Sequence, residues 1–226
     1  MLQQLHHGLI VSCQAPANSP LHNPSIIAAM AKAAVNQGAV AVRIDSPSHI
    51  DAVRQQVEVP IIGLWKRQFP ESEVYITPRY VDAQTIAAVG SDIIAIDATL
   101  RPRPEGEEMG EIIRKIKAEL GKLVMADVDS LEGAIAAAEA GADLIGTTLY
   151  GYTKATRHLT PPGFDLLQAM VEKLEVPIIC EGGLSSIALC QKARSLGAYA
   201  VVVGTAITGI DLQVQAYVQG LNLAGG

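Results

Sequence analysis

Short runs of apolar residues, many of them β-branched, alternate along the chain with longer stretches in which apolar residues recur every three or four positions. Most of the short runs are apolar on both faces, which is typical of parallel strands covered on both sides. The predicted strands are Gly8–Cys13, Val40–Ile44, Pro60–Leu64, Ile93–Ile96, Leu123–Ala126, Leu144–Thr147, Pro177–Cys180 and Ala200–Val203.

Helical patterns fill the intervals between these strands. The clearest is Ser130–Ala140, which Asp129 or Ser130 can cap and Gly141 can end. The others are Pro24–Gln37, Glu107–Leu120, Phe164–Leu174, Ser185–Ser195 and a final Leu212–Leu223. Eight strands alternating with helices predict an α/β fold, a single (β/α)8 TIM barrel over residues 1–226. A doubly wound open sheet is the alternative.

Composition narrows the class of protein. Of 226 residues, 49% are hydrophobic but only 4% aromatic, which suits layers built from Ala, Val, Ile and Leu. The net charge of −6 argues against a nucleic-acid or membrane-surface partner. No apolar run approaches the roughly 20 residues that cross a bilayer.

Cysteine use points to a reducing compartment. The three cysteines, Cys13, Cys180 and Cys190, form no CxxC pair, so we expect no metal site. Cys13 and Cys180 lie in apolar runs and are expected to be buried. An odd count and the lack of a secretory signal pattern predict a cytoplasmic protein.

Active sites of such barrels lie at the carboxyl ends of the strands. The residues expected there are mostly polar: Gln14, Arg43, Lys66, Asp97, Asp127, Thr148, Glu181 and Gly204. Polar side chains at these positions face the mouth of the barrel rather than its filled interior.

Glycines after the last two strands suggest a phosphate site. Gly182 and Gly183 follow the seventh strand, and Gly204 and Thr205 follow the eighth. Glycine lets the backbone approach an anion, and a helix that starts nearby offers free N–H groups. Tight turns without a ligand are the alternative, but the pair of loops together favours phosphate.

Lys66 and Glu181 are the candidate proton carriers. Lys66 directly follows a buried strand, so we expect it to reach bulk solvent with difficulty and to act as a general base or a Schiff-base nucleophile. Glu181 could move a proton or hold Lys66 or a substrate hydroxyl. The alternatives are a solvated loop lysine and an ion-paired rim residue.

Other polar residues allow two interpretations each. Arg43 could hold an anionic oxygen or pair with the neighbouring Asp45. Asp97 and Asp127 could bind sugar hydroxyls or cap the turns that follow them. His49 is expected on the surface of a helix.

The chain resembles the bacterial N-acylglucosamine-6-phosphate 2-epimerases, which convert N-acetylmannosamine 6-phosphate to N-acetylglucosamine 6-phosphate. The matching segments cover essentially the whole chain in order: LIVSCQA (9–15), AVRID (41–45), PIIGLWKR (60–67), VYITP (74–78), IIAIDATLRPRP (93–104), MADVDS (125–130), GTTLYGYT (146–153), IICEGG (178–183) and VVVGTAIT (201–208).

The resemblance implies a cofactor-free and metal-free isomerase that acts on a phosphosugar in amino-sugar and sialic acid catabolism. It implies catalytic roles for Lys66 and Glu181. The implied substrate contacts are Gln14, Arg43 and Asp127, and the implied phosphate site is Gly182, Gly183, Gly204 and Thr205. Thr148 and Tyr152 are further predicted substrate contacts. Removal of the C2 proton would give an enolate, stabilised by a cation such as Arg43, and reprotonation of the other face would give the epimer.

The chain departs from the family pattern at two places. Gly209 stands where relatives tend to have Arg, and Tyr150 replaces a residue that is usually smaller. A lyase or aldolase that uses Lys66 as a Schiff base remains an alternative, as does a sugar-phosphate sensor. The apolar final helix, taken with the resemblance, predicts a homodimer, in which this helix covers the barrel and leaves part of its face open to a partner.

Overall fold

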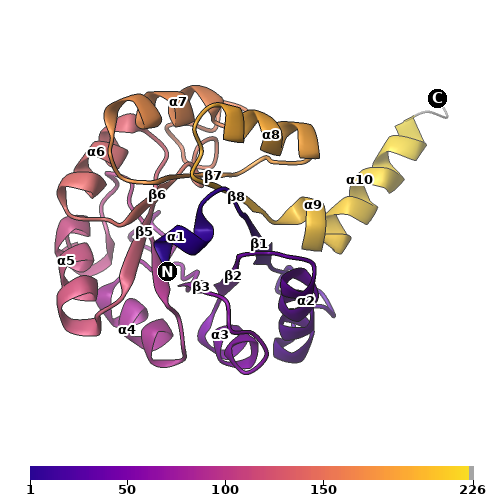
Figure 1. The fold of residues 1–226 in the computed structure, drawn as a ribbon, viewed down its shortest axis with the longest axis horizontal. Helices are drawn as coiled ribbons and strands as arrows, with labels where there is room; N and C mark the ends of the chain where they lie inside the picture. The colour runs from indigo at the N-terminus through magenta and orange to yellow at the C-terminus, as the bar shows by residue number, and fades with distance from the viewer. Residues whose placement is uncertain (224–226) are drawn as a thin grey trace.

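The computed structural model describes residues 1–223, and within this range eight parallel strands close into a barrel (Figure 1). The strands are β1 (Leu9–Cys13), β2 (Ala41–Asp45), β3 (Ile61–Leu64), β4 (Ile93–Asp97), β5 (Leu123–Asp127), β6 (Leu144–Gly146), β7 (Ile178–Glu181) and β8 (Ala200–Val203). β1 pairs with both β2 and β8, which closes the sheet. The predicted barrel is therefore confirmed, and the open-sheet alternative is wrong.

Helices lie between successive strands and cover the outside of the barrel, except for the first, which precedes β1, and the last two, which follow β8 (Figure 1). They are α1 (Leu2–Leu5), α2 (Pro24–Asn36), α3 (Pro47–Arg54), α4 (Tyr80–Ala88), α5 (Met109–Leu120), α6 (Leu131–Glu139), α7 (Phe164–Lys173), α8 (Ile187–Ser195), α9 (Thr205–Thr208) and α10 (Ile210–Leu223), with a 3-10 turn η1 (Pro104–Gly106). Capping fixes several starts, as where the Ser130 side chain accepts the N–H of Gly133.

Side chains alternate between the two faces of each strand, and this alternation positions the site. On β2, Val42 and Ile44 pack outward against the helices, whereas Ala41 faces the barrel interior. Because successive side chains point to opposite faces, Arg43 and Asp45 also face inward. The same rule turns Asp127 and Glu181 into the barrel.

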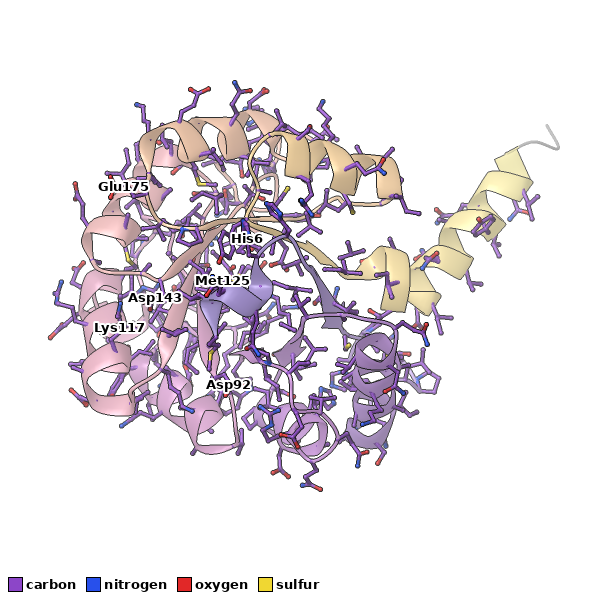
Figure 2. All side chains as sticks on the ribbon, in the orientation of Figure 1. His6, Asp92, Lys117, Met125, Asp143 and Glu175 are labelled. Atoms are coloured by element: carbon purple, nitrogen blue, oxygen red, sulfur yellow. The ribbon has the colours of Figure 1, made fainter. Side chains whose placement is uncertain are left out.

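An apolar layer fills the barrel below these polar positions. Met125 belongs to this layer and lies within the ring of strands (Figure 2). Leu5 of α1 is fully buried in the same layer and closes the amino-terminal end of the barrel. Any cavity inside the barrel can therefore open only toward the carboxyl ends of the strands.

Carboxylates at the amino-terminal ends of two strands tie neighbouring elements together. Asp143 accepts the N–H of Val124 at 2.9 Å and pairs with Lys117 at 2.8 Å (Figure 2). Asp92 does the same for Ile61 and Arg54. These contacts lie at the end of the barrel away from the predicted site, so their role is stability.

The last helix does not cover the barrel as expected. α10 runs away from the barrel (Figure 1), and its Tyr217 and Leu221 side chains are 75% and 74% exposed. Gly209 makes the turn between α9 and α10, where an added Cβ would come within 2.8 Å of the Thr205 Cα. This turn has no room for the Arg expected from relatives. The glycine-rich segment at 224–226 lies outside the described residues.

The outer face that this helix leaves uncovered is hollow. A groove of about 430 Å³ lies beside α8 and β8, with Leu9, Val201, Val203, Ile187 and Ile207 among its lining residues. In a closed barrel the helix after the eighth strand would cover this place. One molecule therefore exposes both an apolar helix and an apolar groove.

Candidate active site

A cavity of about 570 Å³ opens at the carboxyl ends of the strands. Most of the predicted site residues line it: Gln14, Arg43, Lys66, Thr148, Tyr152, Glu181, Gly182, Gly183, Gly204 and Thr205. Asp127 is fully buried beneath them and is joined to the cavity through Arg43. The structure therefore brings together residues from across the whole chain.

Arg43 is the centre of a buried ion-pair network. Its Nη1 and Nη2 donate to the two carboxylate oxygens of Asp127, at 3.2 and 2.6 Å. Its Nε lies 3.2 Å from Glu181 Oε1. The expected alternative, a pair between Arg43 and Asp45, is wrong. The guanidinium is 3% exposed and holds the two carboxylates.

Thr148 bridges the same two carboxylates. Its hydroxyl lies 2.7 Å from Asp127 Oδ1 and 3.1 Å from Glu181 Oε2. Thr148 follows β6, while Asp127 ends β5 and Glu181 ends β7. Because β6 lies between β5 and β7 in the barrel, the hydroxyl lies between the two carboxylates.

Burial raises the pKa of Glu181 to about 7, and the negative charge of Asp127 acts in the same direction. Arg43, the hydroxyl of Thr148 and Lys66 lower the pKa and offset part of this shift. A carboxyl group that titrates near neutrality can both hold and release a proton under physiological conditions. This property is what a general acid–base role requires.

Lys66 lies on the opposite side of the mouth and is more exposed than expected. Its side chain is 44% exposed, so the expectation of restricted access to solvent is wrong. Its backbone N–H donates to Asp45 Oδ1 at 2.9 Å, and its Nζ lies 3.9 Å from Asp45 Oδ2. Asp45 thus fixes the main chain at Lys66 and lies close to its ammonium group.

Asp45 was not among the predicted site residues, because β2 was expected to end at Ile44. It also lines the cavity. The two-residue alternation from Arg43 is the signal that could have found it. His49, expected on the surface, is 5% exposed, and its Nδ1 lies 3.1 Å from the Asp45 carbonyl oxygen.

Lys66 and Glu181 face each other across the barrel mouth. Lys66 follows β3 and Glu181 ends β7, and in the closed order of strands three strands lie between β3 and β7 on either side. A substrate bound between them would have one group on each of its faces. Inversion of a carbon centre by two proton carriers needs this arrangement.

Tyr75 is a second cavity residue that sequence reasoning missed. It lies in the segment after β3, which forms a bridge between Lys66 and Ile76. Burial raises the pKa of Tyr75 to about 12, and the charges of Asp127 and Asp97 add to the shift. The phenol therefore stays protonated and can donate a hydrogen bond.

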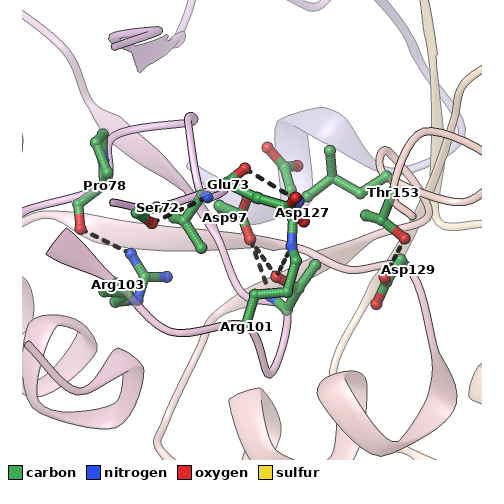
Figure 3. Close-up of polar contacts among 12 residues, drawn as sticks. Ser72, Glu73, Pro78, Asp97, Arg101, Arg103, Asp127, Asp129 and Thr153 are labelled. Atoms are coloured by element: carbon green, nitrogen blue, oxygen red, sulfur yellow. Dashed lines mark hydrogen bonds and ion pairs between the residues drawn. The ribbon is translucent and has the colours of Figure 1, made fainter. Parts of the chain in front are cut away.

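Asp97 makes contacts that fit a turn cap rather than a substrate ligand. Its side chain is fully buried and accepts the N–H and hydroxyl of Thr99, at 3.1 and 2.7 Å. Arg101 donates to it at 2.7 Å, as Figure 3 shows. A similar contact joins Thr153 to Asp129 at 2.6 Å and holds the loop after β6 (Figure 3).

The two glycine loops line one side of the cavity. Gly182 and Gly183 have φ angles of +99° and +69°, a region that favours glycine. α9 starts directly at Thr205, but α8 begins only at Ile187, so its N-terminus does not directly follow the glycine pair. A Cβ on Gly183 would come within 2.7 Å of the Pro161 carbonyl carbon, so this glycine is also needed for packing.

Two further features are absent from residues 1–223. Over that range no three His, Cys, Asp or Glu side chains are grouped as metal ligands. No helix in this part of the chain has both the length and the apolar character needed to cross a membrane.

Known proteins are similar to this chain in sequence and in fold. A family model described as "Putative N-acetylmannosamine-6-phosphate epimerase" matches residues 27–222. A relative from Synechococcus elongatus named "Putative N-acetylmannosamine-6-phosphate 2-epimerase" is 64% identical over 98% of this chain and 96% of its own. A relative of the same name from Thermosynechococcus vestitus is 63% identical over 96% of this chain and 95% of its own length.

A solved structure agrees with these matches. The N-acetylmannosamine-6-phosphate 2-epimerase from Clostridium perfringens superposes with a TM-score of 0.93 at 38% identity, over 97% of this chain and 95% of that one. Both the sequence matches and the shared barrel therefore show that the chain belongs to the N-acetylmannosamine-6-phosphate 2-epimerase family.

Proposed function

We propose that this chain interconverts N-acetylmannosamine 6-phosphate and N-acetylglucosamine 6-phosphate by proton transfer at C2 between two groups, Lys66 and Glu181. The observation that carries this proposal is their placement on opposite sides of the mouth, after β3 and at the end of β7. Each group then meets one face of the sugar.

The reaction starts from the open-chain sugar, in which the C1 aldehyde acidifies the C2 proton. One group removes this proton, and the electron pair moves into the C1 carbonyl to give an enolate. The other group then delivers its own proton to the opposite face of C2 and restores the aldehyde. In the reverse direction the two groups exchange roles.

From the network around Arg43 we infer a role for this residue that differs from the one first expected. Since Arg43 is engaged with Asp127 and Glu181, it orients the proton carrier instead of binding the enolate. Neutral donors that line the same cavity, Tyr75, Gln14 and Ser12, are the groups available for the C1 oxygen.

Phosphate recognition relies on neutral groups at the two glycine loops. The lining residues from Gly182 to Ser185 and from Gly204 to Ala206 include no Lys or Arg. Backbone N–H groups and the Thr205 helix start would bind the phosphate, and this remote binding would align C2 between the two carriers.

Proton NMR tests the proposed activity directly. Addition of the protein to N-acetylmannosamine 6-phosphate should produce N-acetylglucosamine 6-phosphate, and the unphosphorylated sugar should show a much lower kcat/KM. Inorganic phosphate should inhibit competitively at constant ionic strength. Equal use of both sugars would contradict the phosphate site, and no product would contradict the activity.

We also propose that two copies form a dimer by exchanging α10. This helix carries exposed Leu212, Val214, Tyr217, Val218 and Leu221, and its one charged residue is Asp211. The groove beside α8 and β8 is apolar and lacks a covering helix. A second copy supplies the matching surface for both, because each molecule exposes one helix and one groove.

Light scattering at micromolar concentration tests the dimer. Wild type should show twice the mass of the 23.8 kDa chain, and a Tyr217→Asp, Leu221→Asp variant should shift toward monomer. Val81, 49% exposed on α4, provides the control: Val81→Asp should stay dimeric. A monomeric wild type would contradict the proposal.

A further inference from the structure

The hydroxyl of Thr148 lies between two carboxyl groups but carries a single hydrogen. It lies 2.7 Å from Asp127 Oδ1 and 3.1 Å from Glu181 Oε2. One hydrogen can be donated to only one of these oxygens at a time. The second contact is favourable only when the carboxyl group on that side carries a proton and donates it to Oγ1.

The surrounding contacts limit which hydrogens can change direction. Arg43 donates two N–H groups to Asp127 and places Nε against Glu181, and a guanidinium keeps its hydrogens in a fixed fork. Asp127 is fully buried and the Glu181 side chain is 13% exposed. The hydrogens free to reorient in this network are therefore that of the Thr148 hydroxyl and the acidic proton of Glu181.

We propose that Thr148 is a positioning residue whose hydrogen bond follows the protonation state of Glu181. When Glu181 is protonated, its Oε2–H donates to Thr148 Oγ1, and the Thr148 hydroxyl donates to Asp127. When Glu181 delivers its proton to C2, the hydroxyl turns about the Cβ–Oγ bond and donates to Oε2. Thr148 keeps its own hydrogen throughout, and no proton is passed to Asp127.

This inference rests on the proposed role of Glu181 as a proton carrier, and it replaces the substrate contact predicted for Thr148. The consequence is that neither state of Glu181 is left without a partner. Delivery to C2 needs the Oε2–H of Glu181 to turn from Thr148 toward the substrate and the Thr148 hydroxyl to rotate toward Oε2. Only these two hydrogens reorient, so the carboxyl group keeps its position in both directions of the reaction.

The charged and titratable groups around Glu181 come from several elements. Arg43 of β2, Asp127 of β5 and Lys66 after β3 act on its charge, as the hydroxyl of Thr148 does through a hydrogen bond. Glu181 in turn raises the pKa of Tyr152, together with burial, and contributes to the raised pKa of Cys180. Removing the Thr148 hydroxyl should therefore raise the pKa of Glu181 further, because the bond that Thr148 donates to the charged carboxylate is stronger than the one it accepts from the neutral acid.

The variants Thr148→Val and Thr148→Ser test the inference. Thr148→Val keeps the shape but removes the hydroxyl, and it should lower kcat about 10- to 100-fold, the effect of one hydrogen bond to a charged group, while KM changes little. The pH limb of kcat that reports Glu181 should move to higher pH. Thr148→Ser should restore both. Thr153→Val removes a hydroxyl–carboxylate bond from the same loop without touching Glu181, so it should leave the pH limb in place.

Each other outcome has a distinct meaning. A folded Thr148→Val protein with wild-type kcat and pH profile would overturn the inference. So would a raised KM at unchanged kcat, which would make Thr148 a substrate ligand, or a Thr148→Ser variant as slow as Thr148→Val. Glu181→Gln separates the two levels: if it retains turnover, the proposed function fails; if it is inactive while Thr148→Val is normal, only the role of Thr148 fails.

Discussion

The two sides of the barrel mouth hold the two proposed proton carriers, Lys66 and Glu181, in opposite ways. On the β3 side Lys66 is 44% exposed and is held by a single carboxylate, that of Asp45. On the β7 side Glu181 is 13% exposed and contacts a network of Arg43, Asp127 and Thr148. The comparison teaches that one carrier can exchange protons with solvent directly, whereas the other depends on fixed neighbours to remain both protonatable and oriented.

The largest expected effect comes from removing Lys66 on the exposed side of the mouth. Lys66→Ala should lower kcat by about 10²–10⁴-fold, the usual cost of losing a positioned acid–base group. The fold should be retained, because the side chain is exposed at the rim. Steady-state kinetics and circular dichroism check this. A folded variant with near-normal turnover would exclude Lys66, and trapping of wild type by borohydride with substrate would indicate a Schiff base instead.

The next largest effect is expected from removing Arg43 on the buried side of the mouth. Arg43→Met should destabilise the protein by about 3–5 kcal/mol, because it leaves Asp127 and Glu181 buried without their cation. Urea denaturation measures the change. A loss below about 1 kcal/mol would mean that water or movement of the carboxylates replaces the guanidinium, and the network would then not be rigid.

The sequence predicts much of this arrangement. Continuous apolar runs placed every strand within one residue of its observed bounds, because β-branched runs between helices have few other uses. The same pattern brought Lys66, Glu181 and the glycine loops to one end. α4 was missed, since YVDAQTIAA is short and carries weak apolar periodicity. α3 received no bounds, although His49 was expected on a helix, because PSHIDAVR spans only eight residues.

What the sequence did not predict depends on long-range packing. The pairing of Arg43 with Asp127 joins residues 84 positions apart, so only the closed barrel reveals it. The neighbouring Asp45 was the simpler candidate for the ion-pair partner of Arg43, but it contacts Lys66 instead. The course of α10 was equally inaccessible, because its apolar residues fit either its own barrel or a partner, and the turn at Gly209 decides the direction.

A pH-dependent effect sharpens the comparison. The pKa of Glu181 is raised by burial to about 7 in the folded protein, above its ordinary value of 4.5, so the folded state binds more protons than the unfolded state between these values. Stability should therefore fall as pH rises through this window. Glu181→Gln removes the charge, and its stability relative to wild type should increase from pH 5 to pH 8, by on the order of 1–3 kcal/mol.

Urea titrations of both proteins at the two pH values measure this difference. Because all other titrating groups are shared, they largely cancel in the comparison. A difference that is the same at pH 5 and pH 8 would show that the carboxyl group does not change its protonation state on folding in this range.

The smallest expected effect is on the stability of the exposed side. Lys66→Met should change the free energy of unfolding by less than about 0.5 kcal/mol, as is usual for surface substitutions. The same urea experiment that destabilises Arg43→Met provides the scale. A loss of several kcal/mol would show that the Asp45 contact is structural and that the two sides are more alike than described.

The measurement that tests the central claim most directly is a reaction in D2O followed by proton NMR in the first turnovers. Two carriers on opposite faces predict that N-acetylglucosamine 6-phosphate carries deuterium at C2 from the start, because the group that delivers the proton has already exchanged with solvent. The remaining N-acetylmannosamine 6-phosphate should still carry protium at that time. Product that retains the C2 protium of its substrate would mean that one shielded group removes and returns the same proton, and would contradict the account.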